Sequence, residues 1–161
     1  MAPEAELAVV GCGDQSQADE GAGLALVRQL RDDGVPPGVR LVDAAGAGID
    51  VALQLRGAKR VIVVDAGGTG APAGTVSRVS GAEVDEMPPL SGLRSQSFRW
   101  DHALAFARWL LGEDYPADVT VYLIEAADRT PGGALSGPTR EGMKQVLRLI
   151  LRERAFKGAP S

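Results

Sequence analysis

The 161-residue sequence has very few of the residues that most often carry catalysis or bind metals: one histidine, His102, and one cysteine, Cys12. A lone cysteine excludes an internal disulfide and a cysteine-rich zinc site, and it suits the reducing cytoplasm. Cys12 lies between two glycines after an apolar run, so we expect a small buried hydrophobe rather than a nucleophile. A Ser-His-Asp triad would have to use His102, and no G-x-S-x-G motif is present to hold its serine.

Two classes of partner are also disfavoured. The net charge is −4 and the basic residues form no cluster, so we expect no nucleic acid. No apolar run reaches the roughly 18 residues of a membrane span, and the acidic start "MAPEAELAVVGCG" is unlike a signal peptide. We therefore expect a cytoplasmic monomer that binds neither nucleic acid nor membranes.

What the sequence does contain is typical of one globular domain spanning residues 1–161. It is 45% hydrophobic and 24% charged, and its 21 glycines and 10 prolines indicate many tight turns. Apolar runs and helical spacings alternate along the chain. Buried strands are predicted at 7–11, 39–44, 60–66 and 119–126, an edge strand at 75–80, and helices at 20–33, 48–57, 101–112 and 139–154. The β-branched run at 60–66 is predicted to be the central strand, and residues 81–96 are expected to be mostly irregular.

The helix predicted at 101–112 contains the single histidine. Asp101 is expected to be its N-cap and Gly112 its C-terminal stop. The aromatic residues around it are interpreted mainly as core anchors, with a role in lining a partner groove as the alternative: Phe98, Trp100, Phe106 and Trp109.

This order of elements predicts the α/β class, as a three-layer α/β/α sandwich around a mostly parallel, twisted sheet. In such folds ligands bind beyond the carboxyl ends of the strands. The loops after residues 11, 43, 65 and 126 should form that edge.

Acidic residues follow two of the predicted strands at this edge. Asp19 and Glu20 close the first loop, and Asp65 ends the central strand. In one interpretation the acids are structural: Asp19 caps the next helix, the pair complements its dipole, and Asp65 binds backbone groups. In the other, carboxylates from separate strand ends converge on a cation or share a proton, which offsets their repulsion. The residues alone leave both interpretations open.

The sequence G-C-G after the first strand allows a third interpretation, a nucleotide- or flavin-binding domain. However, position 16, where a dinucleotide loop has its third glycine, is Ser16. The acidic pair that follows would repel a pyrophosphate, and no Walker motif is present. Nucleotide binding is therefore disfavoured.

Taken together, several segments resemble one enzyme family. "VVGCGDQSQADEGAG" is similar to the opening of the NiFe-hydrogenase maturation proteases, whose signature is G-x-G-N, a spacer, two acids and Gly-x-Gly. Three later segments resemble that family in the same order and over nearly the whole chain: "LVDAAGAGIDVALQLRGAKRVIVVDA", "GAPAGTVSRV" and "HALAFARWLLGEDYPADVTVYLIEAADRTPGGALSGP". The sequence is thus identified as a member on four motifs in register.

The resemblance implies an α/β sandwich endopeptidase that acts on the large-subunit precursor of a NiFe hydrogenase. After nickel insertion such an enzyme removes the C-terminal extension, and it holds no permanent cofactor because the nickel belongs to the substrate. The implied catalytic and metal-sensing acids are Glu20 and Asp65, with water as the attacking species. Asp43 and Asp19 are expected to bind substrate.

The sequence departs from the family pattern at the third metal ligand, which is a histidine before a helix. An ungapped match places Gln96 there, so Gln96 is the expected third ligand, through a carbonyl oxygen that suits nickel less well than imidazole does. His102 lies six residues farther on, about 9 Å and 240° along a helix, and should face elsewhere unless residues 96–101 loop back. Asp14 and "AAG" at 44–46 also replace family residues. These departures keep open a non-cleaving assembly factor or chaperone that binds the same precursor.

Overall fold

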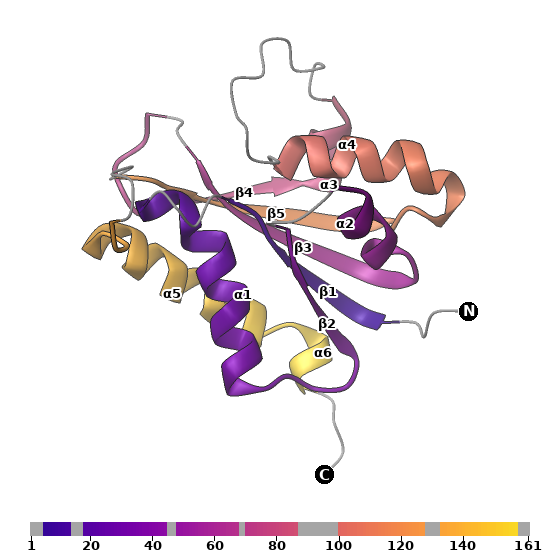
Figure 1. Cartoon of the computed structure of the whole chain (residues 1–161), viewed down its shortest axis with the longest axis horizontal. Helices are drawn as coiled ribbons and strands as arrows, with labels where there is room; N and C mark the ends of the chain where they lie inside the picture. Colours follow the sequence, from indigo (N-terminus) through magenta and orange to yellow (C-terminus); the bar gives the residue numbers. More distant parts are fainter. Residues whose placement is uncertain are drawn as a thin grey trace.

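The computed structural model describes residues 5–13, 18–44, 48–67, 70–86, 100–127 and 133–157. Strands and helices alternate along most of the chain (Figure 1). The strands are β1 (Ala5–Gly11), β2 (Val39–Asp43), β3 (Ala58–Gly67), β4 (Val76–Ser80) and β5 (Asp118–Glu125). The α-helices are α1 (Ala22–Asp33), α2 (Gly48–Leu55), α3 (Gly81–Glu86), α4 (Trp100–Leu111), α5 (Gly137–Leu151) and α6 (Arg154–Lys157). Two 3-10 turns, η1 (Ala18–Gly21) and η2 (Gly112–Asp114), precede α1 and follow α4.

The strands form one five-stranded sheet in the order β2-β1-β3-β5-β4. β1 runs parallel to β2 and β3, and β3 runs parallel to β5, whereas β4 is antiparallel to β5 at the edge. The predictions of a central strand at 60–66 and an edge strand at 75–80 are both confirmed. All four parallel strands deliver their carboxyl ends to the same edge of the sheet.

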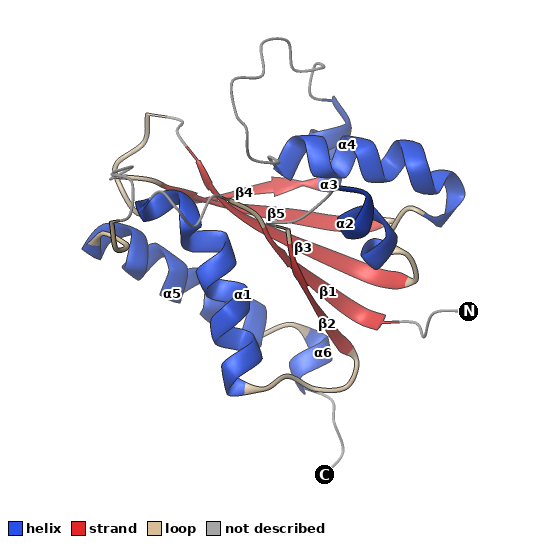
Figure 2. Ribbon diagram, in the orientation of Figure 1, coloured by secondary structure: helices blue, strands red, loops and turns tan. Residues whose placement is uncertain are grey.

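Helices cover both faces of this twisted sheet, which confirms the predicted three-layer sandwich. α1, α5 and α6 lie on one face, and α2, α3 and α4 lie on the other (Figure 2). β3 supplies both layers of core, because Val61 and Val63 pack towards α2 and α4 while Ile62 and Val64 pack towards α1 and α5. Among the described residues, no helix has the length and apolar character that crossing a membrane requires.

Three local predictions differ from the structure. Residues 81–86 form the short helix α3 where an irregular segment was expected; the rest of that segment, from residue 87, lies outside the described residues. Asp101 is not the N-cap of α4, because the helix already begins at Trp100 and Asp101 lies in its first turn. α5 begins at Gly137 rather than Thr139, since the Ser136 side chain accepts a hydrogen bond from the Thr139 N–H and caps the helix. The predicted stop at Gly112 is confirmed, with φ of 52°.

The aromatic residues of α4 are only partly in the core. Trp100 is buried and Phe106 packs against the core from a half-buried position, but Trp109 is 77% exposed. Trp109 lies nine residues after Trp100, which is about two and a half helical turns, so it emerges on the opposite side of the helix. The interpretation of Trp109 as a core anchor is therefore wrong, and Phe98 lies outside the described residues.

Candidate active site

Two of the predicted site acids, Asp43 and Asp65, lie near the carboxyl ends of β2 and β3. In the strand register, Asp43 of β2 pairs with Gly11 of β1, and Gly11 pairs with Val64 of β3. Asp65 is therefore one residue beyond the level of Asp43, with β1 between them. Two strand spacings separate the backbones of the two acids by about 10 Å.

Asp65 is a buried carboxylate, 6% exposed, held in one orientation by backbone donors. Its Oδ1 accepts a hydrogen bond of 2.8 Å from the Ala66 N–H, and its Oδ2 accepts one of 3.4 Å from the Trp100 N–H. Trp100 is the first residue of α4, so the carboxylate faces the partly positive N-terminus of that helix. Asp65 thus binds backbone groups, as the first interpretation expects, and the helix end compensates a negative charge at this position; its convergence with other carboxylates stays a prediction.

Glu20 belongs to η1, which contacts β3, the strand that carries Asp65. The chain just after Glu20 approaches the strand ends very closely: a Cβ on Gly23 would lie 2.3 Å from the Val64 oxygen and 2.4 Å from the Cys12 oxygen. The backbone therefore brings the two acid-bearing segments together. The side chain of Glu20 lies outside the described part of the structure, so its convergence with Asp65 stays a prediction.

Asp19 joins two loops at this edge. It is fully buried, and its carboxylate accepts hydrogen bonds of 2.7 Å from the Ala127 N–H, 2.7 Å from the Ser136 N–H and 2.8 Å from the Ser136 hydroxyl. It does not cap α1, whose N-cap is Gly21 with no side-chain hydrogen bond. The prediction of an Asp19 N-cap is therefore wrong, because the turn η1 intervenes and Asp19 reaches the loop between β5 and α5 instead. Its expected contact with substrate stays a prediction.

Asp43 lies at the more open end of the same edge. Its Oδ2 forms an ion pair of 3.3 Å with the Arg28 guanidinium from α1, and the two side chains are 25% and 44% exposed. At that exposure the pair contributes little to stability. Asp43 is accessible to a ligand from solvent, and substrate binding by it stays a prediction.

Cys12 lies among the acids of the edge. It is fully buried, and its pKa is raised well above the ordinary 9.0 by burial first and then by the negative charges of Asp65, Asp101 and Asp43. The thiol therefore stays neutral, which confirms the interpretation of Cys12 as a small buried hydrophobe. Asp101 directly follows Trp100, whose N–H binds Asp65, so the backbone of Asp101 lies near that carboxylate. Sequence reasoning considered Asp101 only as a helix cap, and its position next to a strand-end acid had no local signal.

Among the described residues, no three histidine, cysteine or acidic side chains are arranged to hold a metal ion. Gln96, the expected third ligand, lies outside the described residues. His102 is helical, as expected, because α4 contains its backbone, but its side chain is also outside the described part. The choice between Gln96 and His102 stays a prediction.

Nucleotide binding through the G-C-G loop has little support in this geometry. A dinucleotide loop opens directly into its helix, whereas α1 begins only at Ala22, after the turn η1. Asp19, inside that turn, is buried against the loop before α5. In its described part, the first loop buries Asp19 against a neighbouring loop and does not lead directly into α1.

Comparison with known proteins shows the family of the chain. The chain is 31% identical to the hydrogenase expression/formation protein HupD of Thiocapsa roseopersicina over 156 residues, which cover 94% of this chain and 68% of the relative. It is 30% identical to HoxM of Azotobacter vinelandii over 155 residues, covering 93% of this chain and 72% of the relative. The chain belongs to the NiFe-hydrogenase maturation protease family. No protein-family model matches it.

Solved structures of maturation proteases have the same fold as this one. The hydrogenase maturating endopeptidase HybD from E. coli superposes with a TM-score of 0.73 at 18% identity, over 91% of this chain and 90% of the other. The [NiFe] hydrogenase maturation protease HybD from Thermococcus kodakarensis gives 0.72 at 21% identity, over 90% and 96%. At these identities the likeness establishes the fold, and it confirms the predicted α/β sandwich of this maturation protease.

The raised pKa of Cys12 gives this maturation protease a pH-dependent stability. Above about pH 9 the thiol ionises in the unfolded chain but not in the folded one, so stability falls as the pH rises. We expect the free energy of unfolding of the wild type, relative to Cys12→Ala, to be about 1 kcal/mol lower at pH 10 than at pH 7.5. Urea titrations of both proteins at the two pH values measure this, and a difference that does not change with pH would contradict a neutral buried thiol.

Proposed function

We propose that this protein is the endopeptidase that removes the C-terminal extension from the large-subunit precursor of a NiFe hydrogenase. The observation that carries the proposal is the buried carboxylate of Asp65, 6% exposed, at the end of β3. It faces the start of α4 and lies on the strand that η1, with Glu20, contacts. Relatives of this chain are named hydrogenase expression/formation proteins, and its solved neighbours are named a hydrogenase maturating endopeptidase and a hydrogenase maturation protease, which supports the same activity here.

Nickel enters this proposal as part of the substrate. Asp65 and Glu20 would bind the nickel already inserted in the precursor, through carboxylate oxygens at roughly 2.0–2.2 Å. Gln96 would add a neutral amide oxygen, and Asp43 and Asp19 would border the bound chain. Because carboxylate and amide oxygens are harder donors than imidazole, this set suits brief recognition of a loaded precursor better than permanent retention of nickel.

The reaction is the hydrolysis of one peptide bond. Water adds to the scissile carbonyl carbon, which nickel or a nearby group polarises, and a carboxylate at the edge accepts the proton of that water. The C–N bond would then break as the departing amine receives that proton back from the carboxylate, and the precursor would keep a new C-terminal carboxylate. The Asp65 carboxylate is already fixed by the Ala66 and Trp100 N–H groups. The groups around its charge would therefore need little reorganisation during the reaction.

We place this reaction in the cytoplasm, with the protein acting as a monomer. The lone cysteine stays reduced there and is buried in the fold. The net charge of −4 gives no support to binding nucleic acid or an anionic membrane surface.

The test is incubation of this protein with its natural precursor in nickel-loaded and nickel-free forms, followed by intact-mass measurement. We expect the loaded form to lose the mass of the extension and the nickel-free form to stay intact. A loaded precursor that stays whole, while a positive-control protease cuts it, would contradict the proposal. If that uncut precursor also remained bound, the protein would be a non-cleaving assembly factor.

A further inference from the structure

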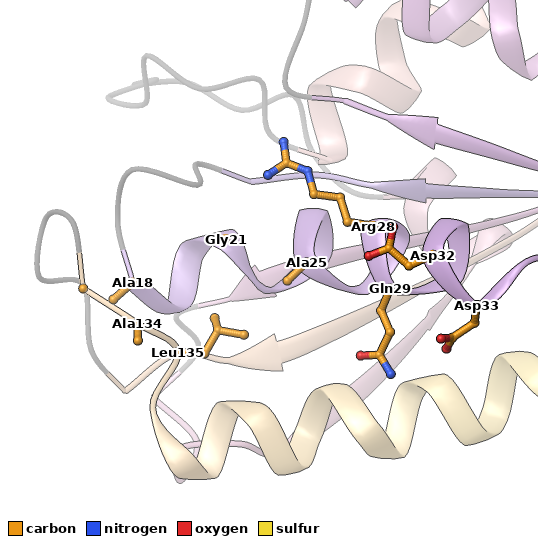
Figure 3. A pocket seen from close by; sticks show the side chains of 10 residues that line it. Ala18, Gly21, Ala25, Arg28, Gln29, Asp32, Asp33, Ala134 and Leu135 are labelled. Atoms are coloured by element: carbon orange, nitrogen blue, oxygen red, sulfur yellow. The ribbon is translucent and has the colours of Figure 1, made fainter.

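A surface groove of about 540 Å³ runs along α1, beside the loop that leads into α5 (Figure 3). Near η1 its lining is small and partly apolar, and towards the end of α1 it becomes polar and acidic. The lining residues are Ala18, Gly21, Ala25, Arg28, Gln29, Asp32, Asp33, Gly133, Ala134 and Leu135. This volume is in the range of natural ligand sites.

The groove adjoins two segments of the candidate active site. Ala18 and Gly21 line it and are the two ends of η1, the turn that contains Glu20. Farther along, Arg28 also lines the groove and forms the 3.3 Å ion pair with Asp43. One end of the groove therefore lies beside the turn that carries Glu20, and Arg28 connects its lining to Asp43.

The walls of the groove are held together by the buried carboxylate of Asp19. One wall is η1 with the start of α1, and the other is the loop at residues 133–135. Asp19 of η1 accepts two hydrogen bonds from Ser136, the residue that ends this loop, and one from Ala127. The separation of the walls is thus set by the fold, and binding there does not have to order them.

The dimensions suit an extended peptide. From Gly21 to Asp33 α1 rises about 18 Å, which matches roughly five residues of extended chain. Gly21 and Ala25 keep the first part of the groove free of long side chains, so a peptide backbone can approach α1 closely. Among the residues of α1 that line the groove, the first long side chain is that of Arg28.

The far end of the groove is negatively charged. Asp32 and Asp33 are exposed and are the last two residues of α1, where the helix dipole adds partial negative charge. In Figure 3 they lie at the end opposite Ala18, Ala134 and Leu135. This end would attract a lysine or arginine side chain and repel an acidic one.

We propose that this groove binds the C-terminal extension of the precursor as an extended segment of about five residues that follows the cut bond, with a basic side chain near Asp32 and Asp33. The inference rests on the proposed function and deepens it. The groove gives the extension a binding site on the enzyme separate from the nickel, and it lets the enzyme select precursors by the charge of their extension.

The test compares two tryptophan substitutions at exposed positions of the same helix, α1. Gln29 lines the groove, whereas Arg31 is exposed but outside the lining. We expect Gln29→Trp to raise both the Kd for the precursor and the KM of cleavage at least about tenfold, with kcat within about twofold of the wild type, because the new ring fills the groove but not the catalytic edge. Arg31→Trp should change each value less than about twofold.

A charge variant tests the acidic end separately and also serves if Gln29→Trp does not fold. The double variant Asp32→Asn with Asp33→Asn should raise the Kd about fivefold for a precursor with a basic residue in the extension, and leave it unchanged when that residue is glutamine. Equal effects of the two tryptophan variants on the Kd would overturn the groove assignment. So would a charge variant whose Kd changes by the same factor for the basic and the glutamine precursor.

If the wild type binds the precursor without cutting it, the endopeptidase proposal fails, while these Kd ratios still test whether the groove binds the extension. If it does not bind the precursor at all, both proposals fail.

Discussion

Replacing Asp65 by asparagine is expected to lower kcat/KM for precursor cleavage by at least about a thousandfold, or about 4 kcal/mol of transition-state stabilisation. Asparagine has the same shape and keeps one oxygen for the Ala66 N–H, but it removes the charge held at the start of α4. It would therefore bind a nickel ion far less well, and a neutral amide could not accept a proton from the attacking water. Single-turnover cleavage of the nickel-loaded precursor, followed by intact mass, measures the loss.

A matched control separates this loss from general damage to the sheet. Asp118 is an aspartate at the opposite end of the parallel strands, its side chain is 63% exposed, and it pairs with Arg60. Asp118→Asn should leave kcat/KM within about twofold. Asp65→Asn should remain folded and lose only about 1–2 kcal/mol of stability. Retention of a tenth or more of wild-type activity by Asp65→Asn would show that its charge is not needed.

The largest effect on stability is expected from Gly23→Ala, which should lower the free energy of unfolding by at least about 3 kcal/mol. The added methyl group would lie 2.3 Å from the Val64 oxygen and 2.4 Å from the Cys12 oxygen. Both are backbone atoms at the strand ends, and the Cys12 N–H is bonded to that Val64 oxygen at 2.9 Å, so they cannot move aside without opening the sheet. Urea titration of the two proteins gives the difference.

Gly137→Ala is the matched control for this substitution. Gly137 is also in the first turn of a helix, α5, but a Cβ built there meets nothing within 4 Å. Its replacement should be neutral or stabilise the protein by up to about 1 kcal/mol, because alanine restricts the unfolded chain. If Gly23→Ala were as mild as Gly137→Ala, α1 would not be held against the ends of β1 and β3 by close backbone contact.

Much of the fold was predictable because its determinants are local. The run at 60–66 is β-branched on both faces, as a strand covered by helices on both sides requires, and it is the middle strand β3. Gly112 ends α4 in a left-handed conformation, as glycine after a helix often does. Alternation of such strands with helices leaves few topologies besides a parallel sheet with two helical layers.

The errors involve contacts between residues that are distant in sequence. An aspartate before a helix is the usual pattern of an N-cap, but Asp19 binds Ser136, 117 residues later in the chain. Nothing near Asp19 in the sequence distinguishes these two roles. Similarly, the closeness of Asp101 to Asp65 depends on how the first turn of α4 meets β3. Whether Trp109 is buried depends on which face of α4 turns inward. The four aromatic residues in and before this helix do not specify that face.

The candidate site was predictable to the level of segments. Strand ends and loop acids placed Asp65, Asp43 and Asp19 at one edge, and the structure has all three there. The hydrogen-bond and ion-pair partners of each acid could not be predicted, because tertiary packing decides them. The roles of Glu20 and Gln96 in holding the precursor's nickel stay predictions.

The most direct test of the central claim, that Glu20 and Asp65 act on one nickel ion in the precursor, is the intact mass of nickel-loaded precursor after single-turnover incubation with the wild type and with Glu20→Gln. The account predicts that the wild type removes the extension and that Glu20→Gln is slowed as severely as Asp65→Asn. Cleavage by Glu20→Gln at the wild-type rate would contradict it.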